Sequence, residues 1–269
     1  MTSQETYTHG HHESVVSQHA LRTADEAAAF LRSHVRPGMR LLDMGCGPGS
    51  ITIGLAAWVD PGGVIGVDLD EATLAKARDQ AESKSVVNVE FSQGSVYELP
   101  FHDAEFDVAY AHQLLQHLSD PAAALTEAMR VLKPGGIFGV RDVDWGSTVL
   151  WPHDRLLDRF LDIYYEVARR NGGDAHMGRR IRSLMLAAGY VDVDVSTSVW
   201  TFANAERTAQ WGNQWRTRTL QSNIGQKAVE YGIASQSEIE EVAGAWAAWG
   251  QKPDAYMSFV HGQAIGWKK

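Results

Sequence analysis

The sequence predicts an α/β protein built on a seven-stranded, mostly parallel sheet with helices on both faces. Seven short apolar or alternating segments recur along the chain, and most of them are followed by residues with helical spacing. The first of these segments runs directly into a glycine-rich turn that opens a helix. A mostly helical stretch between the last two strands predicts a helical cap insertion over residues 203–253.

The bulk composition is that of an ordinary globular protein and limits the classes of partner. With 269 residues, the chain can form one large domain or a domain with a cap. Its net charge of −9 argues against a nucleic-acid partner, whose phosphates require Lys and Arg. The single cysteine, Cys46, rules out an intrachain disulfide and suits a reducing cytoplasm. We see no signal peptide, and no apolar run reaches the roughly 18 residues of a membrane span.

The segment from Leu41 to Ser50 organises the rest of the chain. It reads as a short apolar strand, three alternating glycines and the start of a helix that continues from Ile51 to Val59. Glycines allow a sharp bend and close approach of a ligand, and free N–H groups at a helix start favour a carboxylate or phosphate. A dinucleotide fingerprint would need glycine at position 50, where this chain has Ser50. A tight turn without a ligand is the alternative.

An acidic residue follows the second predicted strand, Val64–Val67. Asp68 lies about 20 positions beyond the glycine turn, where a carboxylate can accept hydrogen bonds from both ribose hydroxyls of a nucleoside. The alternative role for Asp68 is the N-cap of the next helix. Asp70 already fits that role, because it directly precedes the helical residues from Glu71 onward.

Two further predicted strands bring polar residues to the same edge. Strand 87–92 is followed by Gly94 and Ser95, and strand 106–111 leads into His112 and Gln113. Ligands of open α/β sheets lie outside the carboxyl ends of the strands, so His112 is expected at the site. His117 follows on the next helical turn, where packing or helix capping is the alternative to a binding role.

The string Leu-Asp-Met-Gly-Cys-Gly-Pro-Gly at 42–49 resembles motif I of class I S-adenosylmethionine (SAM) methyltransferases. The Leu-Lys-Pro-Gly-Gly string at 132–136, before a fifth strand at 137–140, and the order of the elements over residues 24–145 resemble the same family. The ubiquinone/menaquinone-biosynthesis type of small-molecule methyltransferase is the most similar in character. The resemblance implies a Rossmann-like fold, SAM as the cofactor and a small-molecule methyl acceptor. The tryptophans of the 203–253 insertion and the lack of a basic surface predict that this acceptor is hydrophobic or aromatic.

The resemblance also implies which residues bind the cofactor. They are Asp43, Gly45, Cys46, Gly47, Gly49, Asp68, Leu69, Gly94, Ser95, Val96, His112, Gln113 and His117. Two of them have a qualified role: Cys46 also reads as a small packing residue, and Ser95 stands where the family usually has an aspartate against the adenine. A neutral Ser95 can still hydrogen-bond the ring amine, and backbone groups of Val96 then carry more of the adenine contact.

A methyl acceptor with a hydroxyl group would benefit from a general base. His112 is the first candidate, followed by His11, His12 and Asp144. No metal is expected, because a magnesium-dependent mechanism would want carboxylates at the ends of strands four and five, and strand four ends at His112. Two alternatives stay open: a SAM-binding module without catalysis and a nicotinamide-dependent oxidoreductase, against which Ser50 counts.

The two ends of the chain carry further predictions. The His-rich residues 1–22 fit a flap over the site, a disordered tail or a metal site, and we favour the flap, with the methyltransferase domain covering 23–269. A capping box at Thr23 and Glu26 predicts a helix to about Val35. Further helices are expected at 156–168 and 179–188, and strands at 191–195 and 257–265. The tryptophans of the insertion fit a core, an apolar cap over a substrate pocket or a homodimer interface.

Overall fold

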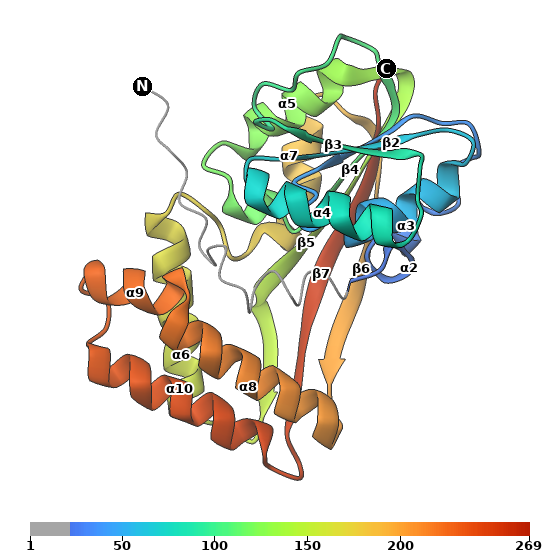
Figure 1. Cartoon of the computed structure of the whole chain (residues 1–269). Coiled ribbons are helices and arrows are strands. Elements are labelled where there is room, and N and C mark those ends of the chain that lie inside the picture. The colour runs from blue at the N-terminus through green and yellow to red at the C-terminus, as the bar shows by residue number, and fades with distance from the viewer. Residues whose placement is uncertain (1–21) are drawn as a thin grey trace.

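The computed structural model describes residues 22–269 and has a single mixed sheet (Figure 1). Along the sheet the strand order is β3-β2-β1-β4-β5-β7-β6, and only β7 runs antiparallel to its neighbours. This confirms the predicted fold class. The strands are β1 (Leu41–Met44), β2 (Val64–Asp68), β3 (Val89–Gln93), β4 (Phe106–His112), β5 (Leu132–Trp151), β6 (Val191–Phe202) and β7 (Tyr256–Trp267).

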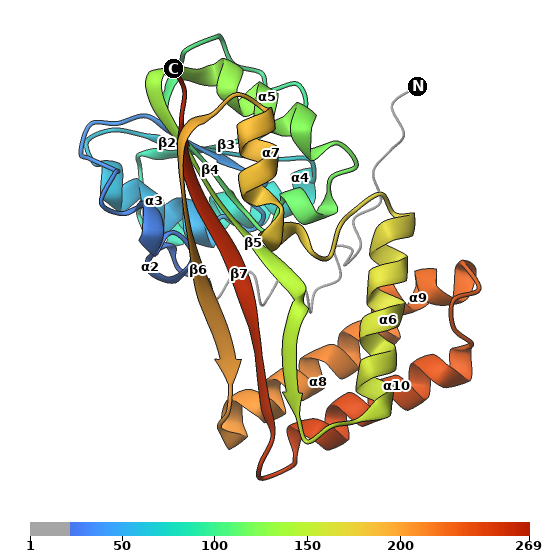
Figure 2. The ribbon, with the colours of Figure 1, turned by 180° about the vertical axis from the view of Figure 1, so that it is seen from behind.

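Helices cover both faces of the sheet (Figures 1 and 2). On one face lie α2 (Ala24–Ala27), the 3₁₀ helix η1 (Ala29–Leu31), α3 (Ser50–Val59) and α4 (Glu71–Ser83). The other face carries 3₁₀ helices η2 (Leu115–His117) and η3 (Met177–Arg179), with α5 (Pro121–Val131) and α7 (Ile181–Ala187). Each face therefore has its own apolar core.

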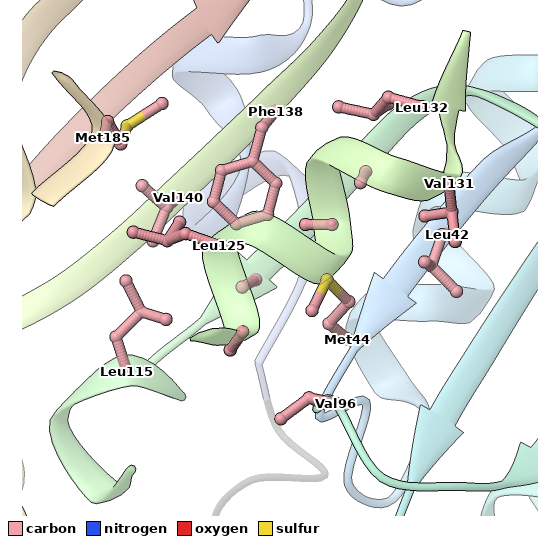
Figure 3. Close-up of a cluster of buried hydrophobic side chains, with 14 of the residues drawn as sticks. Leu42, Met44, Val96, Leu115, Leu125, Val131, Leu132, Phe138, Val140 and Met185 are labelled. Atoms are coloured by element: carbon pink, nitrogen blue, oxygen red, sulfur yellow. The ribbon is translucent and has the colours of Figure 1, made fainter. Parts of the chain in front are cut away.

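The core under α5 shows how the sheet positions the site (Figure 3). Leu125 and Val131 of α5 pack with Leu42 and Met44 of β1 and with Phe138 of β5, and all five side chains are essentially buried. Burial of a large apolar side chain stabilises a fold by roughly 1.5–3 kcal/mol. The strand that leads into the glycine turn is thus held firmly from this face.

The helix predicted to run from Thr23 to about Val35 is shorter in the structure. Thr23 is the N-cap, and its hydroxyl accepts a hydrogen bond from the Glu26 N–H, as the capping box requires. The α-helix ends at Ala27 because Ala28 leaves the helical conformation, with φ −120° and ψ 13°. A 3₁₀ turn follows, and it places Leu31 against Gly139 of β5.

Two strands are longer than predicted, and their pairing with β7 explains why. β5 continues well past the expected residues 137–140, and β6 continues past 195 to Phe202. β7 lies between them and pairs with both as far as Trp151↔Tyr256 and Phe202↔Met257. The Thr, Val, Trp and Phe residues of 196–202 are good strand formers, a signal that the shorter prediction overlooked.

The extended ends of these three strands carry a group of helices that we call the cap (Figures 1 and 2). It consists of α6 (Arg155–Arg170), α8 (Ala205–Gln221), α9 (Asn223–Glu230) and α10 (Gln236–Gly250). Trp211, Trp215, Trp246 and Trp249 of the cap are 0–3% exposed. Trp215 packs edge-on against Trp145 of β5, with ring centroids 5.3 Å apart. This burial favours the core interpretation of the tryptophans. Within residues 22–269, no helix is long and apolar enough to cross a membrane.

Candidate functional site

The glycine turn between β1 and α3 has one open side. Gly45, Gly47 and Gly49 all have left-handed backbone angles, with φ of +70°, +53° and +79°. A Cβ atom at Gly45 would lie 2.8 Å from Leu114 Cδ1, and one at Gly49 would lie 2.8 Å from Ala77 Cβ. At Gly47, by contrast, a Cβ atom would meet no atom of the described part of the chain within 4 Å. The turn is therefore packed at its two ends and open at its middle, where a ligand can approach the backbone.

Asp68 reaches this open side from the end of β2. Its Oδ2 atom accepts a hydrogen bond of 2.9 Å from the Gly47 N–H, and Oδ1 accepts one of 3.1 Å from the Asp70 N–H. Asp70 is the N-cap of α4 and accepts from the Thr73 N–H, so the capping role is filled without Asp68. The side chain of Leu69 is 58% exposed, which leaves an apolar surface beside the Asp68 carboxylate.

Asp43 lies beneath the turn and is almost completely buried. Its carboxylate accepts a hydrogen bond of 2.6 Å from the Thr52 hydroxyl, which comes from the first turn of α3. Burial raises the pKa of Asp43 to about 7, Thr52 opposes this rise, and the nearby charge of Asp68 adds to it. Asp43 is therefore only partly ionised at neutral pH, and together with Asp68 it places negative charge beside the turn, which suits a ligand that carries positive charge.

The segment after β3 forms the next wall. The Gly94 N–H donates to the Asp68 carbonyl oxygen, and a Cβ atom at Gly94 would lie 3.2 Å from Pro100. The Ser95 hydroxyl oxygen accepts from the Tyr97 N–H, which keeps the hydroxyl hydrogen available as a donor. The Val96 side chain is buried in the core under α5, so only its backbone can serve a ligand.

Cys46 behaves as a packing residue inside the turn. Its Sγ atom would lie 2.9 Å from a Cβ atom at Gly66, and burial, with the nearby carboxylates, raises the pKa of the thiol well above its usual range. A neutral, enclosed thiol is a poor nucleophile. A side-chain role for Cys46 toward the cofactor therefore has no support from its chemistry.

The carboxyl end of β4 brings two predicted residues to the site. His112 is buried, and its ring stacks on Tyr110 with centroids 6.5 Å apart. Gln113 has φ +50°, an unusual angle for a residue with a side chain, and such strain gathers at functional sites. His117 follows on η2, where burial and the nearby Arg22 charge lower its pKa to about 3. His117 is thus a neutral imidazole at physiological pH.

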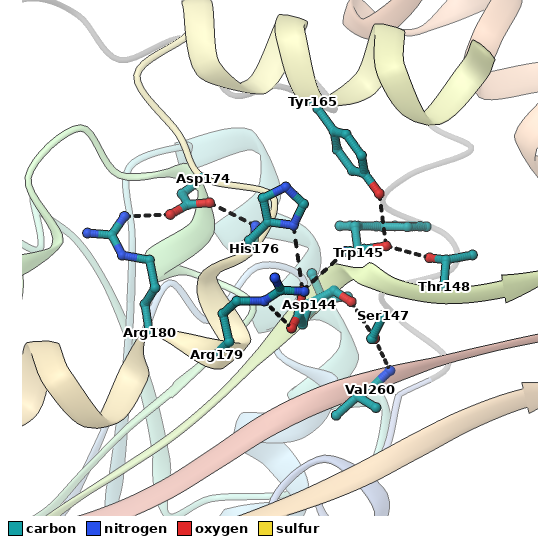
Figure 4. A network of polar contacts seen from close by, with 12 residues as sticks. Asp144, Trp145, Ser147, Thr148, Tyr165, Asp174, His176, Arg179, Arg180 and Val260 are labelled. Atoms are coloured by element: carbon teal, nitrogen blue, oxygen red, sulfur yellow. Dashed lines mark hydrogen bonds and ion pairs between the residues drawn. The ribbon is translucent and has the colours of Figure 1, made fainter. Parts of the chain in front are cut away.

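Asp144 points to the face of the sheet opposite to that of His112, because His112 pairs with Arg141 and Asp144 is three residues further along β5. Figure 4 shows its contacts with Arg179. Successive side chains of a strand point to opposite faces. Asp142 of β5 accepts from the Gln116 N–H on the face of α5, and Asp144 binds Arg179 of η3 on the same face, with contacts of 2.7 and 2.8 Å. This bidentate ion pair favours a structural role for Asp144 over the role of a general base.

The remaining predicted base candidates, His11 and His12, lie outside the described residues, as does the flap apart from Arg22. Within residues 22–269, no group of three His, Cys, Asp or Glu side chains is arranged to hold a metal ion.

Sequence reasoning missed a polar group that surrounds Gln113. The Gln113 Oε1 atom accepts from Arg22 at 2.7 Å, and its Nε2 atom lies 2.8 Å from His261 Nε2 of β7. Arg141, the register partner of His112, lies next to this group on β5. The available signal was Arg141 itself, a basic residue directly after the apolar run 137–140.

Relatives cover the whole chain. An uncharacterized methyltransferase of Schizosaccharomyces pombe is 34% identical over 98% of this chain and 97% of its own length. The ubiquinone/menaquinone biosynthesis C-methyltransferase UbiE of Vibrio parahaemolyticus is 36% identical over 48% of this chain and 49% of its own length. Among solved structures, the YcgJ protein of Bacillus subtilis has a TM-score of 0.62 at 22% identity, covering 91% of this chain and 98% of that one.

A family model described as a methyltransferase domain matches residues 36–187, which include the glycine turn, Asp68 and the end of β4. That match takes in more than half of the chain. Together with the full-length relative, it confirms the resemblance on which the prediction of SAM-dependent methyl transfer was based. The chain belongs to the methyltransferase family and is an enzyme of the SAM-dependent class.

Proposed function

We propose that SAM lies on the open side of the glycine turn, between Asp43 and Asp68, and that its methyl group is transferred to a small molecule beside His112. The open backbone at Gly47 is the observation that carries this proposal. A Cβ atom at Gly45 or Gly49 would contact neighbouring side chains, whereas one at Gly47 would meet no atom of residues 22–269 within 4 Å. The left-handed backbone at Gly47 already favours glycine, and the open space beside it leaves room for a ligand to approach the turn.

The residues around the turn fit the chemistry of SAM. Asp43 and Asp68 supply negative charge for a cofactor that carries a sulfonium and an ammonium group. Asp68 is fixed toward the turn and can accept ribose hydroxyls, and the exposed Leu69 offers an apolar surface to a purine ring. The hydroxyl of Ser95 is available to hydrogen-bond a ring nitrogen.

SAM, when bound, supplies a methyl group activated for in-line displacement by its sulfonium. The protein holds the acceptor and excludes water, and an alignment at about 3–3.5 Å can remove several kcal/mol of the barrier. His112 would accept the proton of a hydroxyl acceptor at an imidazole nitrogen, in the role of general base. Its place at the end of β4 supports this role.

The acceptor proposed here is a small hydrophobic or aromatic molecule. A net charge of −9 disfavours a nucleic-acid substrate. The buried aromatic residues of the cap give the extended ends of β5, β6 and β7 an apolar environment. A cytoplasmic location, a homodimer and closure of the N-terminal flap over the acceptor belong to this proposal as well.

Calorimetry with S-adenosylhomocysteine (SAH), the demethylated product, tests the cofactor site. Asp68→Ala should weaken SAH binding by about 1.5–3 kcal/mol for each charge-assisted hydrogen bond lost. Asp120→Ala is the matched control, because Asp120 caps α5 away from the turn and its loss should cost only about 1 kcal/mol of stability. A folded Asp68→Ala variant with unchanged SAH affinity would contradict the assignment.

A further inference from the structure

Arg141 is a buried cation without a carboxylate in contact. Its side chain is 1% exposed, its Nε atom donates to the Ser198 hydroxyl at 3.0 Å, and its guanidinium lies 5.3 Å from the centre of the Trp200 ring. Among residues 22–269, its Nη1 atom has no hydrogen-bond partner and no carboxylate forms an ion pair with it. Burial lowers the pKa of Arg141 to about 10, so the group stays charged at neutral pH.

His261 presents a second buried donor on the same face. The Arg22 guanidinium can only donate, so the Gln113 atom that it contacts must be the carbonyl oxygen and Gln113 Nε2 must be the donor to His261 Nε2. The proton of the neutral His261 ring is therefore on Nδ1. That atom is buried and has no partner within residues 22–269.

Strand pairing places the two donors together. Arg141 pairs with Gln263 of β7, and His261 precedes Gln263 by two residues on that strand. The side chains of Arg141 and His261 therefore point to the same face of the sheet. Both contact Trp200 of β6, with His261 4.6 Å from it between ring centroids. Arg22 also lies over this indole, at 5.7 Å. The side chain of His112, the register partner of Arg141, is on this face too.

We propose that Arg141 and His261 bind the two oxygens of a carboxylate, on the face of the sheet that holds His112. The Nη1 atom of Arg141 and the Nδ1–H group of His261 both lack an acceptor within residues 22–269, and one ligand with two anionic oxygens would satisfy both. The carboxylate belongs either to the methyl acceptor or to the methionine end of the cofactor. In the first case the inference rests on the proposed function and makes the acceptor an organic acid.

Binding of matched ligand pairs by calorimetry tests the site. The first pairs are carboxylates and their amides, benzoate with benzamide and 3-phenylpropionate with its amide, each measured with and without SAH. The second pair is SAH with 5′-methylthioadenosine, which lacks the amino-acid end. Wild-type protein should prefer the carboxylate member of at least one kind of pair by about tenfold or more.

Variants then assign the preference to the two donors. Arg141→Met should reduce it to less than about twofold, whereas the exposed Arg207→Met, which also removes a guanidinium stacked on a ring, should leave it intact. His261→Phe should reduce it as well, and His261→Asn, which keeps an N–H donor near the Nδ1 position, should retain most of it. The His261 pair keeps the test decisive if Arg141→Met does not fold.

The ligand pair that loses its preference identifies the source of the carboxylate. If the variants lose the preference for benzoate or 3-phenylpropionate over the amide, the site binds the acceptor. If they lose the preference for SAH over 5′-methylthioadenosine, the site binds the cofactor. The proposal is overturned if wild-type protein prefers no carboxylate, or if the preference survives both Arg141→Met and His261→Phe. Failure of wild-type protein to bind SAH would overturn the proposed function alone, because the carboxylates are also tested without it.

Discussion

Replacing Gly47 by alanine separates ligand approach from protein packing. A Cβ atom at this position meets no atom of residues 22–269 within 4 Å, so the cost to folding comes from the left-handed backbone. That cost is roughly 1–2 kcal/mol for a residue with a side chain. The new methyl group projects into the space where we place the cofactor, so SAH affinity should fall by at least about tenfold, or 1.4 kcal/mol.

Gly49→Ala is the matched comparison within the same turn. Its φ of +79° carries the same backbone cost, but its Cβ atom would lie 2.8 Å from both Ala77 Cβ and Phe91 Cζ. Overpacking adds about 1–3 kcal/mol, for a total of roughly 2–5 kcal/mol of lost stability. Gly49→Ala should therefore be the less stable of the two variants.

Urea unfolding and SAH calorimetry on the two variants give the decisive comparison. The expected pattern is a stable Gly47→Ala that binds SAH weakly and a destabilised Gly49→Ala. If Gly47→Ala bound SAH as tightly as wild-type protein, the open side of the turn would not be the cofactor site. If Gly47→Ala proved the less stable variant, the packing analysis of the turn would be wrong.

Three further predictions concern the base, a buried carboxyl and the cap. His112→Ala should lower turnover by about 10²–10⁴-fold, with a smaller effect on SAH affinity. The exposed His102→Ala is the control and should change neither turnover nor SAH affinity. If His112→Ala lost thermal stability but kept its turnover, His112 would be a packing residue. The pKa of Asp43 is raised to about 7 in the folded protein, from about 3.8 in the unfolded chain. Between about pH 4 and 7 the folded state therefore holds a proton that the unfolded state has lost, so stability should fall as pH rises through this range. Asp43→Asn should flatten that fall in urea titrations at several pH values, and an unchanged slope would show that Asp43 is not its source. The tryptophans of the cap share a core with Trp145 of β5, so amide exchange in α8 and α10 should be slow with and without SAH; protection that appeared only with ligand would support a mobile lid.

Local sequence was sufficient for the parts of the site that depend on neighbours along the chain. The glycine turn, the acidic residue at the end of β2 and the helix caps at Thr23 and Asp70 all lie where the sequence predicts them. Each is governed by backbone angles or by hydrogen bonds within a few residues, and those requirements can be read from residue types and spacing. Positions such as Gly47 follow from the same rules.

Tertiary structure alone decided which distant residues meet at the end of β4. Alternation along β5 shows that Arg141 and Asp144 face opposite ways, but not which face holds His112. The register of β4 with β5 decides that, because it pairs His112 with Arg141. β7 lies antiparallel between β5 and β6 and brings His261 and Trp200 to Arg141. Asp144 is directed instead to Arg179. Strand order and register depend on burial summed over the whole sheet, and no local pattern in the sequence specifies them.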